Sequence, residues 1–343
     1  MCPLDLTSEP VPVSRKLTSH DLVGGGSGRA TSCDALVGPG RRLCLSTLHT
    51  HRVQLSASNQ LTAQLMRRLT SLASHYGGVR SVYEAAPFYA PGPYEAWLTL
   101  ACAQRMELAS SHSLADLGGG SGAFATKLKQ AASARWLSIV EPSASMLAGA
   151  EASSDVDSAI CADALGWASS TEDGDGSVAS RGMPARYDRI LLKEVVHHFA
   201  DSDRPLVFRR LRENRLAADG RVLIVTRPQH DIAYPLWEAA REVWAAHQPS
   251  EALLVDELKS AGFRDVATHV HTYPHEVETE KWCRLVEGRF WSTFSHFTDG
   301  ELVEGCARIR ADAAAKAASD AGGDAGVLRF DDRLLLIEAR SGA

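Results

Sequence analysis

Short apolar segments recur between residues 113 and 340. Longer segments that mix apolar and polar residues separate them. The apolar runs lie at 113–117, 136–140, 157–161, 187–193, 221–226, 264–271 and 328–340. Runs of this length with few charges are typical of strands buried on both faces, and the segments between them are long enough for crossover helices. The pattern therefore predicts an α/β fold on a mostly parallel sheet with right-handed crossovers.

Other segments are predicted to be helices or loops. A helix is expected over 59–75, because leucines recur there on one helical face before a Gly-Gly pair. Pro235 is expected to open a helix that runs to His247, and Gly262 to end the helix of "SEALLVDELKSAGF". The polar, glycine-rich stretch 170–184 is expected to be a mobile loop.

The stretch "LADLGGGSGAF" carries the first chemical signal. A short apolar run, a glycine turn and a run of helix formers make the beginning of a nucleotide-binding βαβ unit, in which glycine lets backbone N–H groups approach the ligand. Gly118, Gly120 and Ala123 fit the G-x-G-x-x-A spacing, so a dinucleotide-binding protein is one interpretation.

Asp116 favours a different ligand, because it stands two residues before the first glycine of the turn. A carboxylate there would face a pyrophosphate across low dielectric, at a cost of about several kcal/mol. It suits a ligand with positive charge. S-Adenosylmethionine carries an ammonium and a sulfonium and no phosphate, so the turn together with Asp116 indicates that cofactor.

A second acid follows at the spacing that a nucleoside site requires. Glu141 ends the second predicted strand, 19 residues after Gly122. A carboxylate at a strand tip can accept hydrogen bonds from both ribose hydroxyls. Both cofactor types need an acid here, so Glu141 does not discriminate between them.

Composition excludes several classes of protein. The formal net charge of the 343 residues is −6 and no basic block is present, which argues against a nucleic-acid-binding enzyme. The 7 cysteines are scattered without a CxxC pair, which favours a reduced compartment and argues against a zinc site. His269, His271 and His275 have no acid or cysteine at ligand spacing, so no metal is predicted, and no segment approaches the ~18 apolar residues of a membrane span.

Residues 1–58 differ from the rest of the chain. They are rich in Ser, Thr, Gly, Pro and Arg and contain no aromatic residue. An organelle transit peptide and a disordered extension are both consistent with this composition, although transit peptides usually carry fewer acids. The expected location is cytoplasmic, or organellar if residues 1–58 are a transit peptide.

Five motifs in order resemble class I S-adenosylmethionine-dependent methyltransferases of the small-molecule type, similar to methyltransferase types 11 and 12 and to trans-aconitate-type enzymes. They are "LADLGGGSG", "SIVEPSASML", "ICADAL", "YDRILLKEVVHHF" and "LAADGRVLIVTRP", within 114–340. The resemblance implies a Rossmann-like seven-stranded sheet, with six parallel strands, an antiparallel last strand and a helical cap. It implies a helical cap at 59–112 and a methyltransferase domain at 113–343. The link between the last two strands is short in the family, so about 273–326 is an insertion expected to fold over the active site.

The resemblance also implies roles for individual residues. Asp116, Gly118, Gly120 and Glu141 would hold the methionine and ribose parts of the cofactor, and Asp163 the adenine amino group. The end of the fourth strand lies beside the methyl group in this family. Lys193 is therefore expected at the cofactor, and His198 or, less favoured, His197 is expected as a general base.

Substrate contacts are expected from the cap. Arg289 stands beside a group of aromatic residues at 290–297 that is expected to pack onto the sheet domain, and it could hold a substrate carboxylate bidentately. Tyr94, in the proline-broken aromatic segment that leads into the second predicted cap helix, is the second candidate.

The expected activity is methyl transfer from S-adenosylmethionine to an O or N atom of a small molecule, with a carboxylate-bearing metabolite as one candidate acceptor. Two alternatives stay open: an NAD(P)-dependent oxidoreductase, and a non-catalytic protein that binds S-adenosylmethionine to regulate a partner. The sequence leaves the oligomeric state open.

Overall fold

The computed structural model describes residue 82 and residues 86–170, 182–319 and 324–342. These residues belong to one compact unit. Residues 1–58, the helix expected at 59–75 and most of the loop expected at 170–184 lie outside the described residues.

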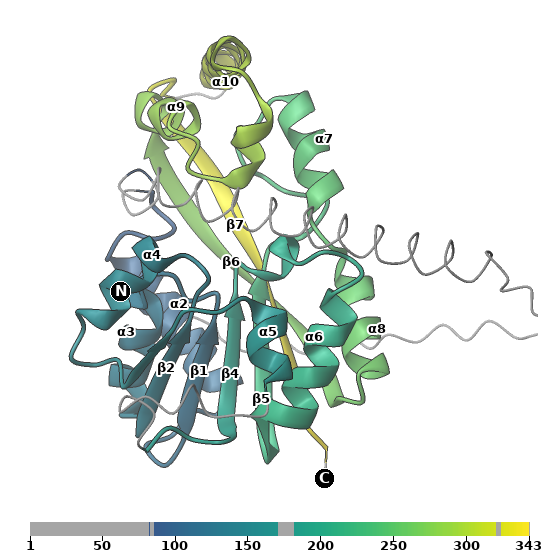
Figure 1. The fold of residues 1–343 in the computed structure, drawn as a ribbon. Helices are drawn as coiled ribbons and strands as arrows, with labels where there is room; N and C mark the ends of the chain where they lie inside the picture. The colour runs from purple at the N-terminus through teal and green to yellow at the C-terminus, as the bar shows by residue number, and fades with distance from the viewer. Residues whose placement is uncertain (1–81, 83–85, 171–181, 320–323, 343) are drawn as a thin grey trace, which may run out of the picture. The chain divides into compact units, whose positions relative to one another are not determined.

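A seven-stranded sheet with the order β3-β2-β1-β4-β5-β7-β6 forms the centre of the fold (Figure 1). The first five strands pair in parallel, and β7 lies antiparallel between β5 and β6. The prediction of six parallel strands and an antiparallel last strand is confirmed. The strands are β1 (Ser113–Leu117), β2 (Trp136–Val140), β3 (Ser158–Ile160), β4 (Tyr187–Lys193), β5 (Leu216–Thr226), β6 (Arg264–Glu278) and β7 (Val327–Arg340).

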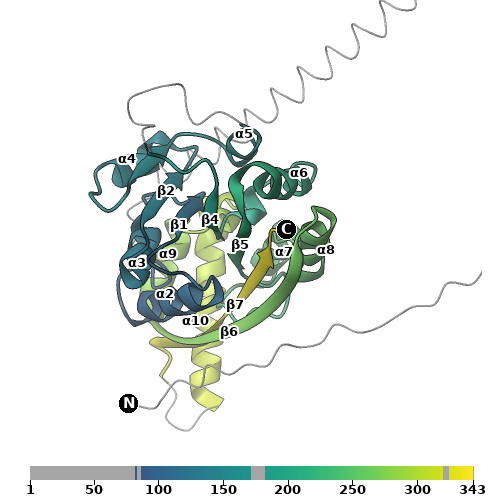
Figure 2. The same ribbon diagram turned by 90° about the horizontal axis from the view of Figure 1, so that it is seen from below.

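Helices cover both faces of the sheet, as the crossover connections require (Figure 2). One apolar cluster joins the sheet to α2 (Pro93–Arg105), α3 (Ala123–Ala132) and α4 (Ala144–Glu151). A second cluster, on the other face, joins it to α5 (Ala164–Ser169), α6 (Arg204–Arg210) and α8 (Glu251–Ser260).

A cap of helices stands beyond the carboxyl ends of the parallel strands (Figure 1). It contains α7 (Glu238–His247), and α9 (Thr279–Glu287) and α10 (Asp299–Ser319) from the segment between β6 and β7. Phe290, Trp291 and Phe294 are buried in the same apolar cluster as Leu191 and Leu223 of the sheet. The expected packing of this aromatic group onto the sheet domain is therefore present.

Several element boundaries differ from the sequence prediction; β5, for example, begins at Leu216 and not at residue 221. β6 continues through Pro274 to Glu278, so the segment between β6 and β7 begins at Thr279, later than the expected 273. Proline is tolerated because β6 is the last strand of the sheet and, among the strands that the structure describes, pairs with β7 alone. α7 begins at Glu238, not at Pro235.

The extension of β6 gives the last two strands a second role. Residues 335–338 and 340 of β7 pair with both β5 and β6, whereas residues 327–334 pair with β6 alone among the described strands. A two-stranded ribbon therefore extends from the sheet into the cap, where Figure 1 shows it beneath α9 and α10.

Candidate active site

The glycine stretch forms a tight turn between β1 and α3. Gly118 and Gly120 have φ values of 75° and 57°, in the left-handed region that favours glycine. A Cβ on Gly118 would lie 2.4 Å from Cγ2 of Val195. The Gly118 N–H donates to the Val140 carbonyl at 2.7 Å, which holds the turn against the end of β2.

The Asp116 side chain lies directly under this turn. A Cβ on Gly119 would stand 2.7 Å from Oδ2 of Asp116, so the bend and the carboxylate are in close approach. The side chain is 3% exposed, and Oδ1 is buried without a hydrogen-bond partner among the described residues. Burial raises the pKa of Asp116 to about 7, while Lys193 opposes and Glu141 adds to the rise. The carboxylate is thus buried at considerable cost with one oxygen left without a donor.

Glu141 and Lys193 lie around the same turn. Glu141 accepts hydrogen bonds from the N–H groups of Gly120 at 3.1 Å and Ser143 at 2.9 Å, and burial raises its pKa. The Lys193 ammonium lies 5.1 Å from the ring centres of both Tyr89 and Phe124, and burial lowers its pKa. Asp116, Glu141 and Lys193 are therefore brought to one place at the carboxyl ends of β1, β2 and β4.

Asp163 has a local structural contact. Its Oδ1 accepts from the Gly166 N–H at 2.8 Å and caps the N-terminus of α5. One of its carboxylate oxygens is thereby occupied.

The segment after β4 brings two further polar groups into the protein interior. Glu194 follows the strand with a φ of 57°. This backbone conformation is uncommon for a residue other than glycine, and residues that adopt it are often found at functional sites. One of its oxygens pairs with Arg227, and Oε1 is buried without a partner among the described residues. Nδ1 of His197 is likewise buried and without a partner within the described chain. Burial, with nearby His198 and Arg227, holds the pKa of His197 well below its usual range, so its imidazole is neutral.

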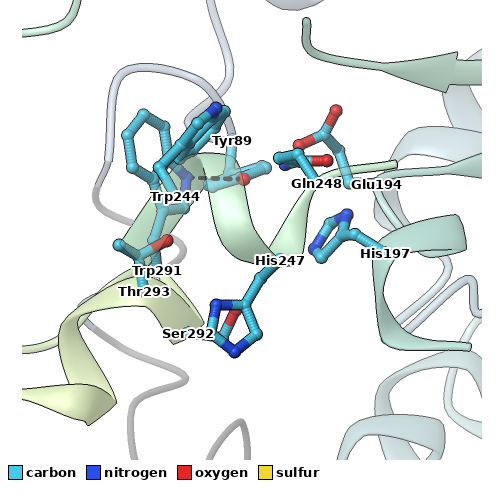
Figure 3. Close-up of a pocket in the computed structure, with 9 residues that line it drawn as sticks. All are labelled: Tyr89, Glu194, His197, Trp244, His247, Gln248, Trp291, Ser292 and Thr293. Carbon is cyan, nitrogen blue, oxygen red and sulfur yellow. Dashed lines mark hydrogen bonds between the residues drawn. The ribbon is translucent and has the colours of Figure 1, made fainter. Parts of the chain in front are cut away.

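A pocket opens beside these groups between the strand ends and the cap (Figure 3). The rings of Tyr89, Trp244 and Trp291 gather on one side of it, with Trp291 Nε1 donating to the Tyr89 hydroxyl at 3.1 Å. The space between the lining residues amounts to about 430 Å³ when the open solvent at its mouth is included, so the enclosed part is much smaller. The lining residues are Tyr89, Glu194, His197, Trp244, His247, Gln248, Trp291, Ser292 and Thr293.

A buried ionic network supports the pocket from behind. Asp332 of β7, which is fully buried, accepts from the Tyr94 hydroxyl at 2.6 Å, from Arg227 Nε at 3.0 Å and from the Tyr234 hydroxyl. Arg227 also pairs with Glu194, and its charge holds the pKa of Asp332 below the usual range against the effect of burial. The network fixes the position of Glu194.

The two predicted substrate residues lie outside the pocket lining. Tyr94 belongs to the buried network, where its hydroxyl is bonded to Asp332. Arg289 donates to the Phe297 carbonyl at 3.0 Å and to Asp299 Oδ1 at 2.7 Å, at the start of α10. His198 does not line the pocket, whereas His197 does.

The pocket also contains residues that the sequence analysis did not single out. Glu194 could have been found, because it follows Lys193 at a strand end, where α/β folds place ligand groups. Trp244, Gln248 and Thr293 gave no such signal, since their position depends on how the cap packs.

The described residues show neither a metal site nor a membrane-spanning helix. Within 86–170, 182–319 and 324–342, no group of three or more His, Cys, Asp or Glu is arranged to hold a metal ion. Nδ1 of His269 lies 3.1 Å from a guanidinium nitrogen (Nη1) of Arg105, and its Nε2 lies 3.2 Å from Oε1 of Glu338. No helix in the described part of the chain has the length and apolar character to cross a bilayer.

Comparisons with known proteins identify the fold. No family model matches the chain, and no curated protein matches its sequence. A solved structure from Anabaena variabilis, named as a candidate methyltransferase of an antibiotic biosynthesis pathway, has a TM-score of 0.50 at 16% identity, over 71% of this chain and 96% of that one. The sheet of this chain, with six parallel strands and an antiparallel β7, is of the Rossmann-like methyltransferase type. This chain has the class I methyltransferase fold.

Two further neighbours of lower similarity were found among solved structures. Phosphoethanolamine N-methyltransferase 2 of Haemonchus contortus, in complex with S-adenosyl-L-methionine, has a TM-score of 0.44 at 16% identity, over 78% of this chain and 57% of that one. Magnesium protoporphyrin IX methyltransferase of Synechocystis, with bound cofactor, has a TM-score of 0.39 at 13% identity, over 80% of this chain and 96% of that one. In the class I fold of the present chain, the glycine turn and the pocket lie at the carboxyl edge of the sheet, where open α/β sheets bind ligands.

Proposed function

We propose that the protein transfers a methyl group from S-adenosylmethionine to an N or O atom of a small molecule. The observation that carries this proposal is the Asp116 carboxylate, buried under the glycine turn with Oδ1 unpartnered among the described residues. A pyrophosphate would add negative charge beside it, whereas an ammonium would supply the missing donor and the compensating charge. The name of the Anabaena neighbour agrees with this reading.

The residues at the turn fit S-adenosylmethionine. Asp116 would hold the ammonium, and Lys193 the carboxylate of the same amino-acid part. Glu141 would accept from ribose hydroxyls with the lone pairs that Gly120 and Ser143 leave free, and Asp163 would accept from the adenine amino group. Gly118 and Gly120 let the backbone approach the ligand. When bound, this cofactor supplies a methyl group on a positively charged sulfur.

The chain itself contributes mainly positioning and exclusion of water. The aromatic side of the pocket holds the apolar part of the acceptor, and the polar groups opposite it orient the reacting atom. We assign His197 to this orientation, because a histidine whose pKa is well lowered accepts a hydrogen bond readily but holds a proton poorly. His198, whose ring centre lies 4.0 Å from that of His197, stays the candidate for proton transfer.

The polar groups in the pocket also bear on the acceptor. Arg289, the residue expected to hold a carboxylate, has its contacts within the cap. The unpartnered pocket atoms Glu194 Oε1 and Gln248 Oε1 are hydrogen-bond acceptors. A carboxylate-bearing acceptor is therefore not the one that this pocket favours.

Calorimetry on the full chain tests the cofactor. S-Adenosylmethionine should bind and NAD should not. Asp116→Asn should weaken binding by about tenfold or more, the usual loss for a charge-assisted hydrogen bond. The matched control is Asp219→Asn, an exposed position on β5, which should leave affinity unchanged. Heat with NAD and none with S-adenosylmethionine would refute the proposal and favour the oxidoreductase.

Turnover requires a separate measurement, because a regulatory protein could bind the same cofactor. The protein is incubated with cofactor labelled in the methyl group and pooled small metabolites. Label in a metabolite supports the enzyme. Binding without any transferred label supports the non-catalytic alternative.

A further inference from the structure

Three residues that line the pocket each have a buried polar atom without a hydrogen-bond partner among the described residues. These atoms are Oε1 of Glu194, Nδ1 of His197 and Oε1 of Gln248. A carboxylate oxygen and an amide oxygen are acceptors, and a neutral imidazole nitrogen accepts in one of its tautomers. Buried acceptors without donors are costly, so the complementary ligand is one rich in N–H or O–H groups.

Two carboxylates share one guanidinium behind the pocket. Arg227 is 2% exposed and is shared between two carboxylates, Asp332 and Glu194. The Tyr94 and Tyr234 hydroxyls add donors to Asp332 but no charge. The Arg227 guanidinium therefore pairs with both carboxylates, and Glu194, whose Oε1 has no partner among the described residues, lines the pocket.

Lys193 is the neighbouring cation. Its ammonium lies over the rings of Tyr89 and Phe124. Among the described residues, no salt bridge of 4 Å or less joins this ammonium to the Glu194 carboxylate. Burial lowers the pKa of Lys193 and raises that of Glu194, while the opposite charges of the two groups favour their ionised forms.

The aromatic side of the pocket is complementary to the same kind of ligand. Tyr89, Trp244 and Trp291 are gathered opposite Glu194 and His197, with Gln248 between (Figure 3). Aromatic faces attract cations, and the attraction grows when water is excluded. A carboxylate facing aromatic rings is an arrangement that suits an organic ammonium ion.

We propose that the methyl acceptor is an amine, whose ammonium group is held between Glu194 and the rings of Tyr89, Trp244 and Trp291. This inference rests on the proposed function. The ammonium loses a proton to solvent through the open mouth of the pocket. The acceptor nitrogen then gives its lone pair to the methyl carbon, and the electrons of the broken carbon–sulfur bond stay on sulfur. The product is an N-methylated ammonium ion, and the reaction is N-methylation rather than O-methylation.

Binding of matched probes to the full chain, without cofactor, tests the acceptor class. The probes are benzylamine, 2-phenylethylamine and butylamine, each compared by calorimetry at pH 7.5 with the alcohol and the carboxylate of the same skeleton. At least one amine should bind about tenfold or more tightly than its alcohol and its acid, the range of a charge-assisted contact. Glu194→Gln, which keeps the shape of the side chain, should bring the amine to within about twofold of the alcohol.

Glu304→Gln is the matched control, at an exposed position of α10, and should leave the preference for amines unchanged. The selectivity of the unaltered protein tests the proposal even if Glu194→Gln does not fold. Absence of binding by every amine, a preference for alcohols or acids, or an amine preference that folded Glu194→Gln retains would overturn it. A separate titration with S-adenosylmethionine distinguishes the two failures: cofactor binding without amine preference refutes the acceptor class alone, and amine preference without cofactor binding refutes the proposed function.

Discussion

Asp116 shows how a single residue can serve a ligand at the expense of the fold. Its carboxylate is enclosed by the protein, has one oxygen without a partner in the described part of the chain, and has its pKa raised to about 7 mainly by burial. A cationic ligand reverses that imbalance, because it favours the ionised form. The residue should therefore titrate in the range where proteins are usually assayed.

Cofactor affinity should consequently depend on pH. Below pH 7, Asp116 must lose a proton before it can pair with an ammonium, so the affinity for S-adenosylmethionine should fall by up to about tenfold per pH unit as pH decreases from 7 to 5.5. Calorimetry at pH 5.5, 6.5 and 7.5 measures this. Asp116→Asn should flatten the dependence, and a flat profile in the unaltered protein would show that this carboxylate does not hold the cation.

Stability should respond in the opposite sense. The pKa of Asp116 is higher in the folded protein than its unfolded value of 3.8, so its contribution to stability falls as pH rises from about 4 to about 7 and stays low above that. At pH 8, Asp116→Asn should therefore unfold at a higher temperature than the unaltered protein, with a gain of about 1–4 kcal/mol. The gain should shrink toward pH 4. A variant less stable at pH 8 would mean that the carboxylate is structural.

At the scale of elements, the glycine turn is the part that tolerates least change. Gly118→Ala would place a methyl group at a φ of 75° and against Val195. It should cost about 1–3 kcal/mol of stability and abolish measurable cofactor binding. Gly300→Ala is the control: this glycine is in α10, has open space around it, and should gain up to about 1 kcal/mol of helix stability. Thermal unfolding and calorimetry measure both, and normal cofactor binding by Gly118→Ala would contradict the assigned role of the turn.

The same scale shows what the sequence could and could not predict. β1, β2 and β4 were predicted to the residue, because each is an apolar run between clear turn signals. The predicted end of β6 was too early. Pro274 looks like a strand terminator, but in the folded sheet it lies on an edge strand, where a missing N–H donor is tolerated. Asp116, Glu141 and Lys193 stand at strand ends, so the fold class placed them together. Trp244, Gln248 and Trp291 belong to the cap, whose position depends on contacts between residues far apart in sequence.

At the scale of the whole molecule, Asp332 joins parts of the chain that are far apart in sequence. Tyr94 is on α2, Arg227 follows β5, Tyr234 precedes α7, and Asp332 is on β7. The network connects the sheet, the cap and the pocket through one carboxylate.

Removal of that carboxylate should be severe. Asp332→Asn leaves the Arg227 guanidinium buried with less compensation and should cost about 3–5 kcal/mol in urea unfolding. Asp331→Asn, at the neighbouring exposed position of β7, should change stability by less than about 0.5 kcal/mol. Equal stability of the two variants would show that the network is not needed for folding.

The ribbon of β6 and β7 has a mechanical consequence for the cap. The same two strands are part of the sheet at one end and reach under α9 and α10 at the other. These two strands therefore provide no flexible hinge between the sheet and the cap. If the cap moves away from the sheet, the hydrogen-bonded pair β6–β7 has to bend along its length. The paired strands form a continuous and elastic connection. A displacement of α10 would therefore be transmitted along β7 to the strands that pair with it in the sheet.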